Sequence, residues 1–143
     1  KYVTFSTVNE DGSPHGSPMF FIPSADAKKL YMGTHPQSLH AQNMLRTGQA
    51  FATIYGRLPD GMRGLYFRLI NCREAVGAEL DEALKCHNIA RAKISKPPLE
   101  KQFYETPNSQ RMIICDVAEI TTNDVTLRQD GRIDIDFRTE ITM

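Results

Sequence analysis

A serine and a histidine two residues apart stand at the expected start of a helix, in the stretch THPQSLHAQNM. Ser38 follows a Gly-Thr-His-Pro turn and is a residue type that often caps helices. Free backbone N–H groups at a helix start, the Ser38 hydroxyl and the His40 imidazole together suit an anion such as phosphate. These residues alone leave a second interpretation open, an ordinary helix cap beside a solvated histidine.

The remaining chemistry-bearing residues form no pattern typical of metal or hydrolytic sites. There are four histidines, which are His15, His35, His40 and His87. They lack H-E-x-x-H spacing, and no G-x-S-x-G motif or carboxylate pair accompanies them. There are three cysteines, which are Cys72, Cys86 and Cys115. An odd number without C-x-x-C spacing favours ordinary buried thiols in a reducing compartment, so we expect a cytoplasmic protein without a metal site.

Length and charge narrow the class of protein further. A chain of 143 residues, 41% of them hydrophobic, suits one domain spanning residues 1–143. Lys plus Arg and Asp plus Glu are both 17, and this zero net charge argues against nucleic-acid or membrane-surface binding. No apolar run reaches the roughly 18 residues of a transmembrane helix. The chain begins at Lys1 within the first expected strand, so we expect further residues to precede it.

One expected strand contains residues that normally weaken strands. Two apolar runs flank an Asp11-Gly12 turn, and the second run opens with two Ser-Pro steps around His15 and Gly16. Proline lacks a hydrogen-bond donor, and glycine in a strand often marks close approach by another group. The segment is therefore either a bulged edge strand without a ligand or a strand that lies against a bound group.

Alternating and helical hydrophobic patterns give the expected element order. Strands are expected at residues 2–8, 14–22, 30–33, 49–55, 62–76 and 109–120, helices at 38–47 and 79–93, and a hairpin at 124–138. The first helix should stop at Gly48, and the second carries His87 on its apolar stripe. About seven strands and two helices with hairpin connections favour a mainly β fold, a β-barrel with peripheral helices.

The order of these segments resembles the pyridoxamine 5′-phosphate oxidase-like, FMN-binding split-barrel family. In that family a D-G-x-P-x-x-S-P strand precedes a strand ending in Tyr-Thr, and S-R-K then opens a helix. Here the corresponding segments are DGSPHGSPMFF, LYMG and SLHAQNM, followed by AFATIY and RGLYFRLINCREA. The resemblance covers roughly residues 3–92 and implies a split barrel with FMN as its cofactor.

The resemblance also assigns the FMN contacts residue by residue. Contacts on two strands are implied for Gly16, Ser17, Pro18, Met19, Phe20, Phe21, Tyr31, Met32, Gly33 and Thr34. The phosphate-binding S-R-K falls on Ser38, Leu39 and His40, so two permanent charges are replaced by one imidazole. Phosphate binding would then depend on Ser38, backbone amides and an arginine such as Arg63 or Arg68.

Family membership would imply a homodimer with FMN at the interface, acting as an oxidoreductase on a small molecule. The flavin carries the redox chemistry in such proteins, so no catalytic pair of side chains is required. Trp is absent, as is the Trp- and Arg-rich tail of true pyridoxamine phosphate oxidases, so a different substrate is expected. Two alternatives remain open: a non-catalytic flavin- or haem-binding module, and a split barrel without a ligand.

Overall fold

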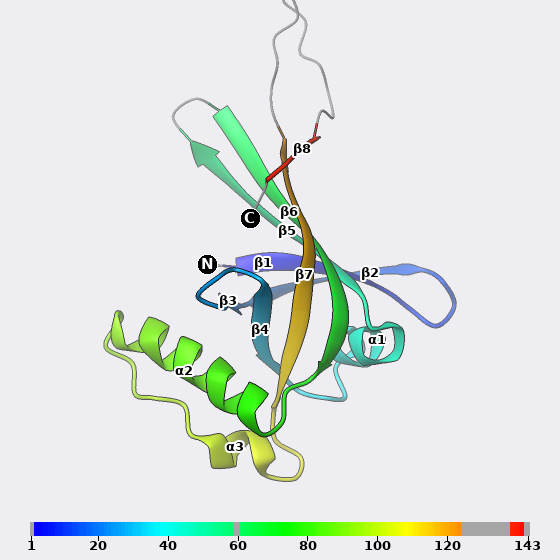
Figure 1. The fold of residues 1–143 in the computed structure, drawn as a ribbon. Helices are drawn as coiled ribbons and strands as arrows, with labels where there is room; N and C mark the ends of the chain where they lie inside the picture. The colour runs from blue at the N-terminus through cyan, green and yellow to red at the C-terminus, as the bar shows by residue number, and fades with distance from the viewer. Residues whose placement is uncertain (1, 59–60, 124–137, 142–143) are drawn as a thin grey trace, which may run out of the picture.

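A curled antiparallel sheet dominates the computed structural model, which describes residues 2–58, 61–123 and 138–141. The elements are β1 (Tyr2–Val8), β2 (Pro14–Phe20), β3 (Ile22–Pro23), β4 (Lys29–Thr34), α1 (Leu39–Thr47), β5 (Ala50–Leu58), β6 (Gly61–Glu74), α2 (Ala78–Ala92), α3 (Lys101–Glu105), β7 (Arg111–Asn123) and β8 (Arg138–Glu140) (Figure 1). The strand order is β2-β1-β5-β6-β7-β4-β3, and β8 pairs with β7. The expected β-barrel with peripheral helices is thus confirmed as a curled sheet.

The two edge strands of this sheet are neighbours in the chain. Only Phe21 separates β2 from β3, although these strands stand at opposite ends of the strand order. The sheet must therefore curl until its edges meet. Pro14 and Pro18 lie in β2, which pairs only with β1 among the described strands. An edge strand tolerates the missing donors, which explains the prolines without strain.

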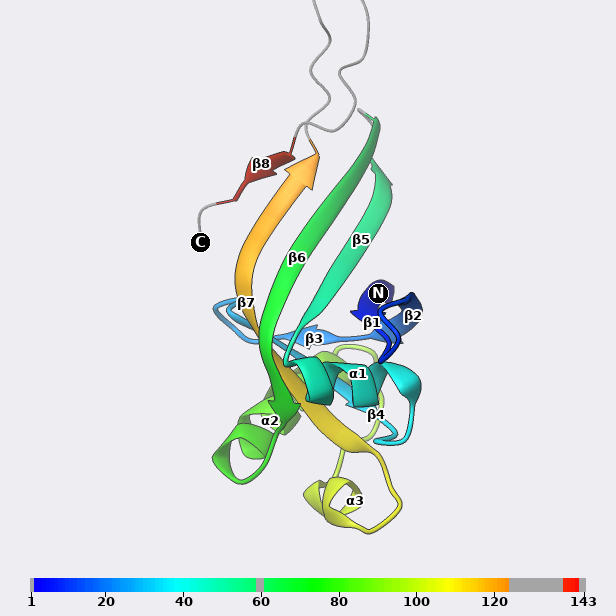
Figure 2. The ribbon, with the colours of Figure 1, turned by 90° about the vertical axis from the view of Figure 1, so that its right-hand side faces the viewer.

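Alternation along the strands produces two separate apolar clusters. The sheet interior contains Val3, Phe5, Met19, Leu30, Met32, Met44, Ala52, Phe67, Leu69, Ile113 and Cys115. The second cluster fills the space between the sheet and the helices α2 and α3, with Tyr31, Leu80, Ala83, Leu84, Tyr104, Met112 and Ile114. Helix α1 lies at a different place, against β1 and β6 (Figure 2). Successive residues of β4 consequently face different surroundings.

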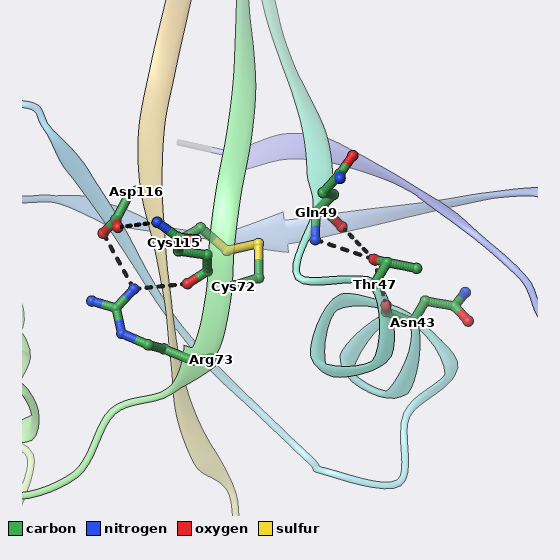
Figure 3. The surroundings of a disulfide bond; sticks show 8 residues. Asn43, Thr47, Gln49, Cys72, Arg73, Cys115 and Asp116 are labelled. Carbon is green, nitrogen blue, oxygen red and sulfur yellow. Dashed lines mark hydrogen bonds and ion pairs between the residues drawn. A yellow bond between two sulfur atoms is a disulfide. The ribbon is translucent and has the colours of Figure 1, made fainter.

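A disulfide bond joins two of the cysteines across β6 and β7. Cys72 and Cys115 have Cα atoms 4.2 Å apart, and Cys86 is free (Figure 3). The expectation of three free thiols is therefore wrong for this pair. The pairing of β6 with β7 shifts between Ile70 and Arg73, and Asn71 has a φ of 50°. This irregularity lets Cys72 reach the interior beside Cys115, which no sequence spacing could reveal.

The helices α1 and α2 confirm the sequence prediction within two residues at each end. Neither the short helix α3 nor the break between β2 and β3 was predicted. The expected hairpin at residues 124–138 lies outside the described residues, except for Arg138 in β8. In the described part of the chain, no helix combines the length and apolar character needed to cross a bilayer.

Candidate functional site

The start of α1 leaves its first backbone N–H groups without a side-chain cap. Ser38 is the N-cap residue, but its hydroxyl makes no cap hydrogen bond and instead donates to the backbone oxygen of His35 at 2.7 Å. The backbone N–H of Ser38 bonds the same oxygen at 3.0 Å. At the other end, Gly48 closes the helix with a φ of 67°. The turn thus fixes Ser38 and leaves the first N–H groups of α1 without a side-chain cap.

Three of the residues predicted to contact FMN meet at this helix start. The His40 Nε2 atom lies 2.6 Å from the Thr34 hydroxyl oxygen and 3.0 Å from the Ser38 hydroxyl oxygen. The two hydroxyl oxygens are 3.2 Å apart. We call Thr34, Ser38 and His40 the α1 polar cluster. It gathers two hydroxyls and one imidazole beside uncapped N–H groups, a combination that can hold an oxyanion.

A second histidine, His15, affects the pKa of His40 in this cluster. The His15 Nε2 atom lies 3.0 Å from the Ser17 hydroxyl oxygen, and both residues are half-buried on β2. Burial lowers the pKa of His40 below its usual 6.5, and the charge of nearby His15 lowers it further. His40 is therefore mainly neutral at pH 7. Sequence reasoning missed His15, although strand alternation places it on the same face as Ser17.

The other predicted contacts on β2 and β4 are divided between faces. Met19 and Met32 are buried in the sheet interior, so their side chains are not available to a ligand from outside. Phe21 packs against the same interior. Tyr31 is buried on the α2 side, and this burial raises its pKa to about 12. The side chains of these four residues therefore belong to the packing of the protein interior and do not line the α1 polar cluster.

Gly16, Pro18 and Phe20 occupy the exposed face of β2, opposite Ser17 and Met19. The nearest atom to a Cβ built at Gly16 is the Thr4 methyl carbon, 3.9 Å away, which is an ordinary contact. Packing within one chain therefore does not require glycine here.

A cavity of about 360 Å³ lies beside α2, and we call it the α2 pocket. It is lined by Phe20, Gly33, His87, Arg91, Ile94, Lys96, Leu99, Tyr104 and Gln110. A Cβ at Gly33 would lie 3.1 Å from the Tyr104 hydroxyl oxygen and 3.3 Å from Gln110 Oε1. Any side chain at this position would therefore require Tyr104 and Gln110 to shift by a few tenths of an ångström. Gly33 and Thr34, adjacent on β4, serve the α2 pocket and the α1 polar cluster respectively.

The two candidate arginines both belong to β6. Arg63 belongs to β6 and pairs with Gly56, but its side chain lies outside the described residues. Arg68 bonds Glu119 with an Nε to Oε2 distance of 3.0 Å. Among described residues, no lysine or arginine hydrogen-bonds to the α1 polar cluster, and no three His, Cys, Asp or Glu side chains gather as a metal site.

The sequence matches one family model over most of its length. The model described as pyridoxamine 5′-phosphate oxidase matches residues 1–114. The chain belongs to this family. No curated protein matches the sequence. The uncapped start of α1 in this family member corresponds to the phosphate-binding position that its sequence predicts.

Solved structures share the fold of this pyridoxamine 5′-phosphate oxidase family member. A haem-binding protein from Mycobacterium smegmatis has a TM-score of 0.68 at 16% identity, covering 97% of this chain and 52% of its own. An FAD-binding protein from the same organism has a TM-score of 0.62 at 11% identity, covering 85% and 83%. An F420 reductase has a TM-score of 0.55 at 15% identity, covering 83% and 87%. The chain spans about half the length of the haem-binding protein, and at these identities the likeness establishes the fold.

Proposed function

We propose that this protein binds FMN through its phosphate at the α1 polar cluster and acts as an FMN-dependent oxidoreductase on a small molecule. The observation that carries the proposal is the uncapped first turn of α1 beside Thr34, Ser38 and His40. Backbone N–H groups and the helix dipole favour an anion at this place, and hydroxyls donate readily to phosphate oxygens. The family match and an FAD-binding relative of the same fold support a flavin ligand.

The residues present fit a phosphate held by hydrogen bonds more than by permanent charge. Thr34 can turn its hydroxyl hydrogen towards a phosphate oxygen, Ser38 can do so by giving up its bond to the His35 oxygen, and His40 can donate from Nε2 when that nitrogen carries hydrogen. When bound, FMN supplies hydride acceptance and donation through its ring. The chain then contributes binding and orientation, because the cluster fixes one end of the ligand relative to the sheet.

A homodimer in the cytoplasm, with FMN at the subunit interface, is part of the proposal. Gly16, Pro18 and Phe20 are exposed on edge strand β2, where an incoming ring or a second chain could approach closely. The room at Gly16 supports this, since among described residues the nearest atom to a Cβ built there is the Thr4 methyl carbon at 3.9 Å.

Ser38→Ala tests the phosphate assignment. It should weaken FMN binding by roughly tenfold to a hundredfold, because a hydrogen bond to a charged group contributes about 1.5–3 kcal/mol. Riboflavin, which lacks the phosphate, should bind the variant and the parent protein alike, as followed by fluorescence titration. Equal losses for the two ligands would remove the phosphate assignment.

Light scattering on the FMN-bound protein should give about twice the 16.2 kDa chain mass, and a monomer would contradict the dimer.

A further inference from the structure

The interior face of the sheet changes from apolar to polar along β2 and β4. On β2 this face carries buried Met19 and then half-buried Ser17 and His15. On β4 it carries Met32 and then Thr34 of the α1 polar cluster. Because β4 pairs antiparallel with β3, which follows β2 after one residue, the start of β2 and the end of β4 lie at the same end of the sheet. Both strands therefore bring polar side chains to the start of α1.

His15 is connected to α1 through β1. The register of β1 with β2 places His15 opposite Thr7, and the Thr7 hydroxyl oxygen accepts a hydrogen bond from Asn43 Nδ2 at 3.2 Å. Asn43 is three residues after His40 and therefore on the same side of α1. The charge of His15 also acts on the His40 ring. The two histidines thus face the same contact between α1 and the strands β1 and β2.

No described carboxylate forms an ion pair with either of these imidazoles. The charged side chains of the flanking elements have other partners or are exposed. Asp11 in the turn before β2 bonds Ser13, Glu10 of the same turn is exposed, and Arg46 of α1 bonds the Val8 backbone oxygen. Two imidazoles in this position repel each other when both are protonated, and an anion beside them removes that repulsion.

Each imidazole has a hydroxyl partner that can itself donate to an anion. The Ser17 hydroxyl oxygen lies 3.0 Å from His15 Nε2, and the Thr34 hydroxyl oxygen lies 2.6 Å from His40 Nε2. When Nε2 carries hydrogen, the hydroxyl accepts that bond and its own hydrogen is free for another acceptor. A protonated imidazole and its hydroxyl therefore offer a phosphate a positive charge and an O–H donor together.

We propose that His15, held by Ser17, is a second imidazole that binds the FMN phosphate together with His40. This inference rests on the proposed flavin function and adds to it a residue from β2 and a dependence on protons. A phosphate dianion favours the charged form of an imidazole beside it, so FMN binding takes up protons from solution. The affinity for FMN accordingly falls as the pH rises.

Calorimetric titration with FMN at pH 7, in two buffers of different ionisation enthalpy, measures the protons taken up on binding. The parent protein should take up protons. His15→Ala should take up several tenths of a proton fewer and bind FMN roughly tenfold more weakly, because a hydrogen bond to a charged group is lost. Riboflavin, which lacks the phosphate, should bind both proteins alike.

Matched variants separate charge from packing. His15→Lys carries a permanent positive charge at pH 7, so it should retain most of the FMN affinity while taking up as few protons as His15→Ala. His35→Ala removes an exposed histidine and should leave both the affinity and the proton uptake unchanged.

The outcomes distinguish this inference from the proposed function. If His15→Ala matches the parent in FMN affinity and proton uptake while Ser38→Ala loses FMN and not riboflavin, the role of His15 is overturned and the phosphate assignment stands. Equal losses of FMN and riboflavin in His15→Ala would also overturn that role, because they would indicate damage to β2. A parent protein that binds FMN no better than riboflavin would overturn both proposals.

Discussion

Two histidines, half-buried His40 at the start of α1 and buried His87 on α2, show how differently the fold treats one residue type. His40 has two hydroxyl oxygens within 3.0 Å of its Nε2, whereas the same atom of His87 has no partner among the described residues. Burial lowers the pKa of both rings. The α1 polar cluster therefore offers several donors and acceptors to an oxyanion, while the α2 pocket contains a covered imidazole nitrogen without a described partner, beside both apolar and cationic side chains. Two adjacent residues of β4 belong to these two environments: Gly33 lines the α2 pocket, and Thr34 is part of the α1 polar cluster.

The largest expected effect concerns the stability cost of charging His87. Its folded pKa of about 4 is below the usual 6.5, so the unfolded chain takes up the proton first as the pH falls. Stability should be complete above pH 6.5 and decline towards pH 4, by roughly 3 kcal/mol in total. His87→Leu should lack this component. Urea unfolding of both proteins at several pH values measures the difference.

His35→Leu is the control for that experiment, because His35 is exposed. Its pH dependence should match that of the parent protein, including the contribution of carboxylates such as Asp11, whose pKa is lowered by hydrogen bonds from Ser13. If His87→Leu and the parent lose stability in parallel, His87 is not held neutral, and the contrast with His40 disappears.

A smaller effect is expected from paired substitutions at two glycines. Gly33→Val places a side chain against the Tyr104 hydroxyl, where even a Cβ would be 3.1 Å away, and should cost about 1–3 kcal/mol. At Gly16 a Cβ meets no described atom closer than 3.9 Å, so Gly16→Val should leave thermal stability unchanged, while abolishing FMN binding if the flavin covers this face. Comparable destabilisation by both substitutions would show that the crowding is not confined to the α2 side. Unchanged FMN affinity in Gly16→Val would place the flavin elsewhere.

The smallest expected effect is the pH dependence of FMN binding through His40. Because its pKa lies below 6.5, the imidazole adds positive charge only in acid. His40→Ala should weaken FMN by roughly tenfold at pH 5.5, with a smaller loss at pH 8. Riboflavin affinity, followed in the same fluorescence titration, should change little at either pH. A larger loss at pH 8 than at pH 5.5 would show that neutral His40 is the form that binds.

Features encoded by neighbouring residues were predictable from the sequence. Ser38 and Gly48 delimit α1 as expected; Gly48 ends it in the left-handed conformation that glycine favours, whereas the Ser38 hydroxyl bonds His35 rather than capping the helix. The apolar stripe of α2 correctly placed His87 in the interior. The turn at Asp11-Gly12 also formed, with Gly12 at a φ of 84°.

Features that depend on distant segments were not predictable. Among described residues His87 Nε2 has no partner, a feature that depends on how α2 packs on the sheet and that a helical pattern does not reveal. Helix α3 has five residues and no side-chain cap, too little for a periodic signal. The disulfide depends on a register shift near Asn71, which local preferences do not specify. Expected interface residues such as Met32 were assigned through the family resemblance, and strand alternation turns that side chain inward.

The disulfide between Cys72 and Cys115 has a further consequence for chain integrity. These residues are 43 positions apart and bracket both α2 and α3, so the bond closes a covalent ring around the helical wall of the α2 pocket. The segment 94–98 within this ring is exposed. A protease that cuts there would open the polypeptide without releasing a fragment, and the two pieces would migrate as one molecule until the sulfurs were reduced. Between Cys72 and Cys115, therefore, a cut in the peptide backbone does not separate the molecule into two parts.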